Sequence, residues 1–190
     1  MTCIIGLVTE TGDVYIGGDS AITWGSNICR VDNDCKVFRN GPFLIGCAGD
    51  MRYMNALRCS FKPPVQPPEQ DTYEYMCASF VDAMRQCLKD AGQAKVESNA
   101  ETTGSWCLVG YRGRLFSVAA DYAVVESQDP DHLETIGNGG AYAQGAATAL
   151  AAWAPEERLL RALEIAEQFC TGVRAPFSVR RLPLDGGDER

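Results

Sequence analysis

The chain has 190 residues, which fits one domain of ordinary size and is too short for two full catalytic domains, so we expect residues 1–190 to form a single domain. Hydrophobic residues make up 46% of the chain and charged residues 22%, the composition of a soluble globular protein. The net charge of −8 argues against nucleic-acid binding, because phosphate contacts need clustered lysine and arginine.

The sequence also favours a cytoplasmic protein without a membrane anchor. The N-terminal apolar run CIIGLV is too short for a signal peptide, and no run approaches the roughly 20 apolar residues of a membrane-spanning helix. The nine cysteines form no C-x-x-C pair, and several lie in apolar runs, which is typical of free thiols in a reducing compartment. Metal-ligand spacing is absent, so we expect no metal and no cofactor.

The first half of the chain begins with β-hairpins and continues into helix. Four β-branched or aromatic runs, TCIIGLVTE, VYIGGDS, CKVFR and FLIGCAG, are divided by turns and one polar stretch. A helix is expected from about Met51, and the four prolines of PPVQPPE interrupt it with an extended loop. Apolar residues then recur at helical spacing over 71–92, with Asp71 or Thr72 as the N-cap and Gly92 near the end.

The second half repeats this order. A polar linker, GQAKVESNAETTGS, leads to the hairpin-like runs WCLVGY, LFSVAA and YAVVES. Two helices follow, divided at Pro155, which suits the first turn of a helix, and FSVRRL closes the chain as a strand. Because helices and strands are segregated, we expect an α+β fold of antiparallel sheets with paired helices packed outside them.

A candidate nucleophile lies at the start of the chain. The only histidine is His132 and there is no G-x-S-x-G motif, so a histidine-based catalytic triad has little support. An N-terminal threonine needs no histidine, because its own α-amine serves as the base. Thr2 qualifies if Met1 is removed, which a small second residue permits. The alternative is that Thr2 only begins the first strand.

Three further residues at strand ends or inside strands could support this nucleophile. Asp19 follows two glycines, and Lys36 lies in an apolar strand, where an ammonium is costly unless it is paired. We expect the two to form an ion pair beside Thr2, which would lower the pKa of its hydroxyl. Gly49 ends its strand and could offer its N–H to an oxyanion. The simpler alternatives are that Lys36 reaches solvent at a sheet edge and that Asp19 and Gly49 belong to ordinary turns.

Together these residues resemble the proteasome β-subunit superfamily of N-terminal nucleophile hydrolases, and within it the bacterial HslV peptidases. The resemblance covers most of the chain: Thr2, GGDS for the family's G-D-x, CKVF for K-K-V, GCAGD for A-G-G, IGNGGAYAQGAA for G-S-G-G-x-Y-A-x-x-A-A, and the late passage IAEQFCTGVRAPFSVRRL. The last two similarities are the most specific.

The resemblance implies a set of roles and an assembly. It makes Thr2 both nucleophile and base, with Asp19 and Lys36 as its electrostatic support. It makes Gly49 the oxyanion donor and puts Asn138 where the family has a serine near the threonine amine. It further implies a four-layer αββα sandwich, a homo-oligomeric ring, a peptide or unfolded-protein substrate, and an ATP-dependent unfoldase as partner.

We therefore expect a threonine endopeptidase of intracellular protein degradation, with two alternatives left open. Asn138, Val173 and Asp50 depart from the family pattern, and Asp50 adds a carboxylate near the cleft. These departures motivate the first alternative, a catalytically inactive, ring-forming structural or regulatory homologue. The second is an amidase for small molecules, because the same threonine and amine chemistry serves other amide substrates.

Overall fold

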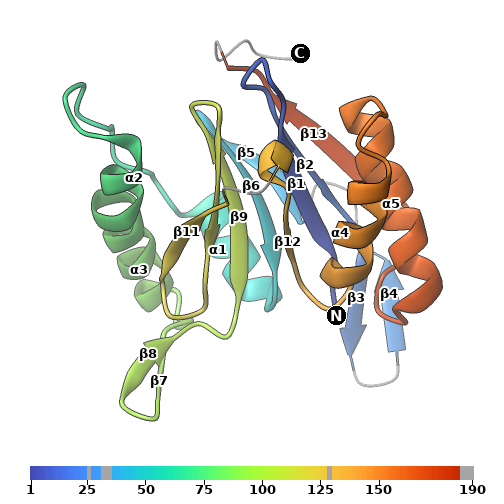
Figure 1. Cartoon of the computed structure of the whole chain (residues 1–190). Coiled ribbons are helices and arrows are strands. Elements are labelled where there is room, and N and C mark those ends of the chain that lie inside the picture. The colour runs from blue at the N-terminus through green and yellow to red at the C-terminus, as the bar shows by residue number, and fades with distance from the viewer. Residues whose placement is uncertain (25–26, 31–35, 128–129, 185–190) are drawn as a thin grey trace.

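The computed structural model describes residues 1–24, 27–30, 36–127 and 130–184, and in these residues two antiparallel sheets carry helices on their outer sides (Figure 1). The first sheet has the order β12 (Glu134–Ile136), β1 (Ile4–Val8), β2 (Val14–Gly18) and β13 (Ser178–Leu182). The second has the order β11 (Val124–Glu126), β10 (Arg114–Val118), β9 (Trp106–Tyr111), β6 (Phe43–Ala48) and β5 (Val37–Asn40). The expected α+β class with antiparallel sheets is confirmed.

One core lies between the two sheets. Alternate residues of each strand face it, among them Ile4 and Ile16 of the first sheet and Leu44 of the second, all with no exposed surface. The sheets approach closely at Gly46, where an added Cβ would lie only 2.7 Å from Cγ2 of both isoleucines. This close contact brings the ends of β1, β2 and β6 together.

A second core lies between the first sheet and two helices, α4 (Gly140–Ala149) and α5 (Pro155–Phe169). Pro155 stands in the first turn of α5, as the sequence predicts. Ala143 and Ala147 of α4 have no exposed surface, and these small side chains let α5 pack close to α4. The alanine-rich stretch is therefore a helix contact.

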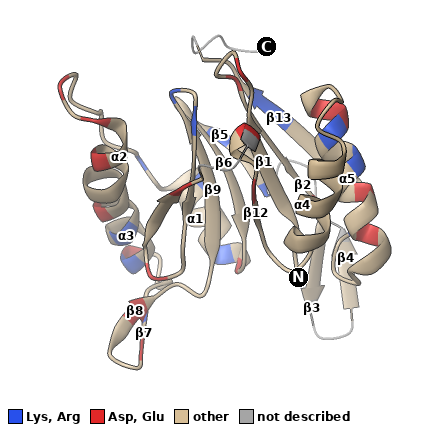
Figure 2. Cartoon of the chain, in the orientation of Figure 1, with Lys and Arg blue, Asp and Glu red and all other residues tan. Residues whose placement is uncertain are grey.

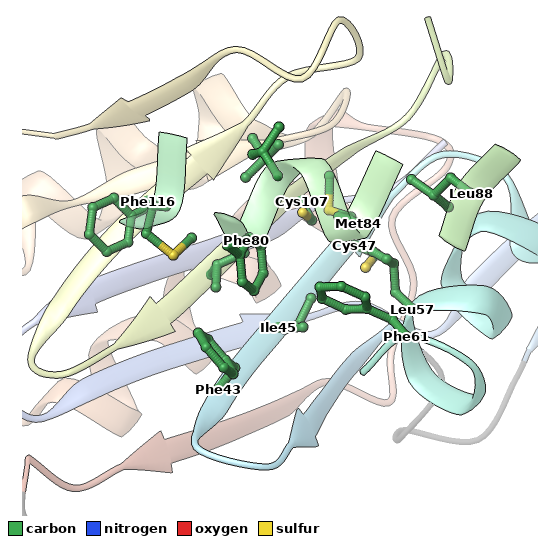
Figure 3. Close-up of a cluster of buried hydrophobic side chains, with 14 of the residues drawn as sticks. Phe43, Ile45, Cys47, Leu57, Phe61, Phe80, Met84, Leu88, Cys107 and Phe116 are labelled. Carbon is green, nitrogen blue, oxygen red and sulfur yellow. The ribbon is translucent and has the colours of Figure 1, made fainter. Parts of the chain in front are cut away.

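A third core lies on the outer side of the second sheet, under α1 (Met51–Cys59), α2 (Thr72–Tyr75), the π-helical turn η1 (Met76–Phe80) and α3 (Val81–Asp90). Figure 3 shows Phe80 and Met84 from these helices above Ile45 and Cys47 of β6. The ring of Phe80 is 5.0 Å from that of Phe43 and 5.2 Å from that of Phe61, measured between centroids.

The helical segment after the prolines has the ends that the sequence predicts. Asp71 is the N-cap, and its Oδ1 accepts the N–H groups of Tyr73 and Glu74 at 2.8 and 3.2 Å. Gly92 has a φ of 71°, and its N–H and that of the next residue bond back to the last turn of α3. This is the Schellman arrangement, in which glycine closes the helix.

The same segment contains a π-helical turn where the sequence predicts a regular helix. Its buried residues Met76, Phe80, Met84 and Leu88 are spaced by four. In a regular α-helix, positions four apart drift round the axis by about 40° at each step. The wider turn of η1 reduces this drift and keeps all four side chains over the sheet.

Three strand segments differ from expectation. The polar stretch after Asp19 contains the hairpin of β3 (Ala21–Trp24) and β4 (Asn27–Arg30), and the polar linker contains the hairpin of β7 (Lys95–Glu97) and β8 (Ala100–Thr102). Ser98 and Asn99 make the second turn with φ values of 51° and 65°, without the glycine that marks such turns. β12 is only three residues long and shows no alternation. These pairings rest on backbone hydrogen bonds, which leave little trace in the side-chain pattern.

Charged side chains gather on the outer helices and turns, with both signs interspersed (Figure 2). Helix α4 is the exception, since it carries no charged residue. In the part of the chain that the structure describes, no helix has the length and apolar character needed to cross a membrane.

Replacing Phe80 with alanine should lower the free energy of unfolding by about 3–5 kcal/mol, because the large ring is fully buried and its cavity cannot close. Urea denaturation at fixed protein concentration measures the change. Val65→Ala is the control, since Val65 is 93% exposed and its truncation should cost less than about 0.5 kcal/mol. Equal losses for the two variants would contradict the described core.

Candidate functional site

Thr2 lies at the end of the first sheet, where β1 begins. The register pairs Ile4 with Ile136 on one side and with Gly18 on the other. Thr2 lies two residues before Ile4, and Asn138 lies two residues after Ile136. The regular pairing does not continue between them, because Gly137 has a φ of 88° and the Thr2 carbonyl accepts the N–H of Gly139, not that of Asn138, at 3.2 Å. Thr2 is 6% exposed, so its surroundings are fixed by packing.

Lys36 reaches Thr2 from the residue before β5, and its side chain is 2% exposed. Its Nζ donates to Oγ1 of Thr2 at 3.1 Å, to Oδ1 of Asp19 at 2.8 Å and to the carbonyl of Ala21 at 2.6 Å. These three acceptors match the three N–H bonds of an ammonium group. The ion pair that the sequence predicts is present, and it is buried rather than at a solvent-facing edge. Cys35, also in the expected strand, lies outside the described residues.

The carboxylate of Asp19 is held by backbone donors as well as by Lys36. Oδ1 accepts the N–H of Cys3 at 3.0 Å, and Oδ2 accepts the N–H of Ala21 at 3.0 Å and that of Arg174 at 3.4 Å. Charge-assisted bonds of this kind offset the cost of burying a carboxylate. Asp19 therefore ties together β1, the segment after β2 and the loop after α5.

Met1 engages the hydroxyl of Thr2. Oγ1 of Thr2 donates to the Met1 carbonyl at 2.8 Å, and the terminal amine of Met1 donates to Oγ1 of Thr23 at 3.2 Å. Gly172 makes room for this residue, because an added Cβ would lie 2.0 Å from Cβ of Met1. With Met1 in place, the nitrogen of Thr2 is an amide and cannot act as a base.

Gly49 follows β6 directly beside this site, and its φ of 136° lies in a region that favours glycine. A Cβ there would come 2.2 Å from Oγ of Ser105, so the position excludes any side chain. Ser105 Oγ in turn accepts the N–H of Asp50 at 3.0 Å. The carboxylate of Asp50, expected near the cleft, caps α1 by accepting the N–H of Arg52 at 2.7 Å.

Two hollows meet at Thr2 and Gly49. The larger is a cleft of about 580 Å³, lined by Met1, Thr2, Ala48, Gly49, Gly104, Trp106, Ser117, Glu134, Thr135, Ile136, Gly137, Asn138, Gly140, Ala141 and Gln144. The smaller, of about 60 Å³, is lined by Met1, Thr2, Ala21, Ile22, Thr23, Lys36, Gly49, Met51 and Met54. Of the five site residues expected from the sequence, Asp19 lines neither hollow but bonds to Lys36. The other four line one hollow or both: Thr2, Lys36, Gly49 and Asn138.

Part of the cleft was not predicted from the sequence. Trp106 was expected only as the first residue of a strand, whereas it is 46% exposed and lines the cleft. Gln144, which belongs to α4, also lines the cleft. The sequence carried no signal for Trp106, because its place beside Ala48 and Gly49 depends on the register of β6 and β9.

Neither His132 nor Val173 lines either hollow. Nδ1 of His132 lies 2.7 Å from the carbonyl of Ser127. Val173 has no exposed surface and packs in the core beneath α4 and α5. Within the described ranges, no group of histidine, cysteine and acidic residues could hold a metal ion.

Comparison with known proteins identifies relatives of the chain. The curated ATP-dependent protease subunit HslV of Caldicellulosiruptor saccharolyticus is 30% identical over 174 residues, which are 89% of this chain and 92% of that protein. The solved structure of Thiobacillus denitrificans BPH has a TM-score of 0.78 at 21% identity, and covers 95% of this chain and 98% of that one. The same protein in complex with epoxomicin gives a TM-score of 0.75 at 20% identity, with the same coverage.

A third structural relative is eukaryotic HslV from Trypanosoma brucei, with a TM-score of 0.65 at 19% identity over 95% of this chain and 98% of that chain. These structures show a shared fold. No protein-family model matches the chain.

Cys3, the neighbour of Thr2, is a poor nucleophile. It has no exposed surface, and burial, followed by the nearby Asp19 carboxylate, raises the pKa of its thiol to about 12. The thiol therefore stays protonated well above pH 9. We predict that iodoacetamide at pH 8 leaves Cys3 unmodified in the folded protein and modifies it after unfolding in urea, as read by peptide mass spectrometry. Rapid labelling of Cys3 in the folded chain would contradict the described burial.

Replacing Asp19 with asparagine should lower the free energy of unfolding by about 3–5 kcal/mol, because the Lys36 ammonium stays buried without its anionic partner. Asp13→Asn is the matched control. Its partner Arg181 has a 40% exposed side chain, so that change should cost less than about 1 kcal/mol. Urea denaturation of both variants measures the difference. Similar falls in the free energy of unfolding would show that the buried Asp19–Lys36 pair is no more important to stability than the exposed pair.

Proposed function

The chain belongs to the HslV family of proteasome-like proteases, and from this premise we propose that it is a threonine endopeptidase whose nucleophile is Thr2 after removal of Met1. The observation that carries the proposal is the contact of 3.1 Å between the buried Lys36 ammonium and Oγ1 of Thr2. A cation at this distance stabilises the alkoxide that develops when the hydroxyl attacks a carbonyl.

Removal of Met1 would change two groups at once. The hydroxyl of Thr2 loses the carbonyl to which it now donates at 2.8 Å. The amide nitrogen becomes a free α-amine, which titrates at about 8 when unperturbed and so is a competent base near neutral pH. The unprocessed chain is latent because it has neither the base nor a free hydroxyl proton.

The reaction then proceeds in two stages. Oγ1 of Thr2 attacks the peptide carbonyl while the α-amine takes its proton, and the N–H of Gly49 binds the oxyanion. Collapse expels the leaving nitrogen with the proton from the α-amine, which leaves an ester on Thr2. The amine next takes a proton from water, the resulting hydroxide attacks the ester, and the proton returns to Oγ1.

Asn138 and Lys36 have different parts in this scheme. Asn138 lines the same cleft as Thr2, and in this scheme its amide hydrogen-bonds the α-amine and orients it, although it cannot relay a proton as a hydroxyl does. Lys36 already donates to three acceptors, which favours a fixed cation over a proton acceptor.

The proposal includes the architecture and the assembly. The cores on both sides of each sheet support one domain with a four-layer αββα order. For a homo-oligomeric ring, the supporting feature is the uncharged α4, where Tyr142 and Phe169 of α5 stack at 5.6 Å while 46% and 63% exposed. The relatives are named as subunits of an ATP-dependent protease, which supports our proposal of an ATP-dependent unfoldase as partner. A cytoplasmic location remains a prediction.

Two alternatives make different predictions. An inactive ring-forming homologue would keep Met1, and intact mass together with native mass on one sample would show an assembled but unprocessed chain. A small-molecule amidase would fail to degrade unfolded casein, with or without an ATPase. The buried Lys36 contact favours the active enzyme, since a structural subunit has no need of an ammonium on this hydroxyl.

The direct test is covalent labelling of a chain released from an N-terminal ubiquitin fusion so that it begins at Thr2. An epoxyketone such as epoxomicin, which binds the structural relative, should add its mass to the Thr2 peptide. Casein hydrolysis should rise with pH as the α-amine loses its proton.

Thr2→Ala should abolish the adduct and reduce casein hydrolysis at least about 10³-fold, whereas Thr2→Ser should keep a measurable rate because it retains a hydroxyl and an α-amine. An adduct on a cysteine, or none on Thr2 in a correctly folded chain, would contradict the proposal.

A further inference from the structure

A half-exposed tryptophan stands in the larger cleft beside Thr2. Trp106 is 46% exposed, whereas the other aromatic residues in the strands of the second sheet are 5% exposed or less. An aromatic ring presents a large rigid surface at low entropic cost, and such rings commonly anchor a bound peptide. The position of Trp106 within a cleft, rather than on an open surface, points to a ligand.

The tryptophan is tied to the reacting centre by the sheet. It pairs directly with Ala48, the residue before Gly49, so both side chains lie on the same face. Ala48 is 6% exposed, and its small side chain leaves room for the neighbouring indole of Trp106. Trp106, Ala48 and Gly49 all line the cleft that reaches Thr2.

The proposed function, on which this inference rests, indicates which part of the peptide substrate occupies this cleft: the segment before the cleaved bond or the segment after it. The α-amine of Thr2 must deliver a proton to the leaving nitrogen, so the leaving segment lies on the side of the amine. Asn138, which we place at the amine, lines the large cleft, whereas Lys36 lines the small hollow. A cleft of about 580 Å³ is in the usual range for ligand pockets, about 300–1,000 Å³.

We propose that this cleft binds the residues that follow the cleaved bond and that Trp106 selects a bulky apolar or aromatic side chain among them. Ile136 and Ala141 extend the apolar surface beside the indole. Asn138 and Gln144 contribute amide groups, which can pair with the N–H and C=O groups of an extended peptide. Trp106 is thus a specificity-determining residue on the leaving side.

The experiment compares cleavage sites before and after truncation of the tryptophan. The chain beginning at Thr2 digests unfolded casein, and mass spectrometry identifies the new peptide N-termini. We expect bulky apolar residues to be enriched in the first positions after the cleaved bond. Trp106→Ala should remove this enrichment and lower kcat/KM for such peptides about tenfold, with the preference before the bond unchanged. Trp106→Phe should retain most of it.

Two controls separate this role from folding and from the catalytic proposal. Trp153→Ala removes a tryptophan that is 49% exposed and does not line the cleft, so the cleavage pattern should not change. Epoxyketones carry no leaving segment, so their rate of adduct formation on Thr2 should be the same in Trp106→Ala and the parent.

Each other outcome overturns the inference. An unchanged cleavage pattern in Trp106→Ala, or enrichment of lysine and arginine that points to Glu134, would show that the indole does not select the substrate. A fall in the epoxyketone rate would show that Trp106 acts on the catalytic centre or on folding. If Trp106→Ala forms the Thr2 adduct normally and its cleavage pattern is unchanged, this inference is rejected and the proposed function stands. If the parent protein forms no adduct on Thr2, both are rejected.

Discussion

A buried ammonium group governs the architecture around Thr2. Lys36 is almost fully enclosed, and an unpaired charge in such a place would be prohibitively costly, so the fold must supply an anion and further acceptors. Asp19 and the Ala21 carbonyl supply them from the segment that follows β2, and Thr2 supplies one from the start of the chain. The requirement couples the beginning of β1, the end of β2 and the beginning of β5, and so fixes the geometry of the hydroxyl.

The packing of the sheets makes this convergence possible. Gly46 allows β6 to lie close against Ile4 and Ile16, which brings the end of β6 to the start of β1. Gly49 then follows at the edge, in a conformation and a space that only glycine fits. The apolar core and the proposed oxyanion donor are in this way parts of one arrangement, since a shift of β6 against β1 and β2 would move the N–H of Gly49.

The sequence predicted the helix ends and the ion pair of the site, each for a different physical reason. The helix ends at Asp71 and Gly92 follow local capping rules, and the ion pair follows from the cost of a lone lysine in an apolar strand. The residues alone suggested that Asp19 and Lys36 pair beside Thr2. Asn138 joined the expected site only through the family resemblance, because spacing along the chain cannot show that Thr2 and Asn138 line the same cleft.

Other features depend on tertiary context. The π-helical turn arises because four buried side chains must stay over one sheet, and β7 and β8 pair through backbone bonds around a turn without glycine. The exposure of Trp106 depends on the small Ala48 across the sheet, a pairing that requires the register of β6 and β9. Asp50, expected near the cleft, has in addition a local role that was not predicted, since its Oδ1 caps α1.

The role of the Lys36 ammonium in activating Thr2 is tested most directly in a Lys36→Met variant that already begins at Thr2. The quantity to measure is the rate at which an epoxyketone modifies Thr2. Native mass and circular dichroism establish that the variant is folded. The account predicts a fall on the order of 10²-fold or more, since the hydroxyl loses the cation that stabilises its charge. A rate within about threefold of the parent, in a folded variant, would contradict the role of the buried ammonium.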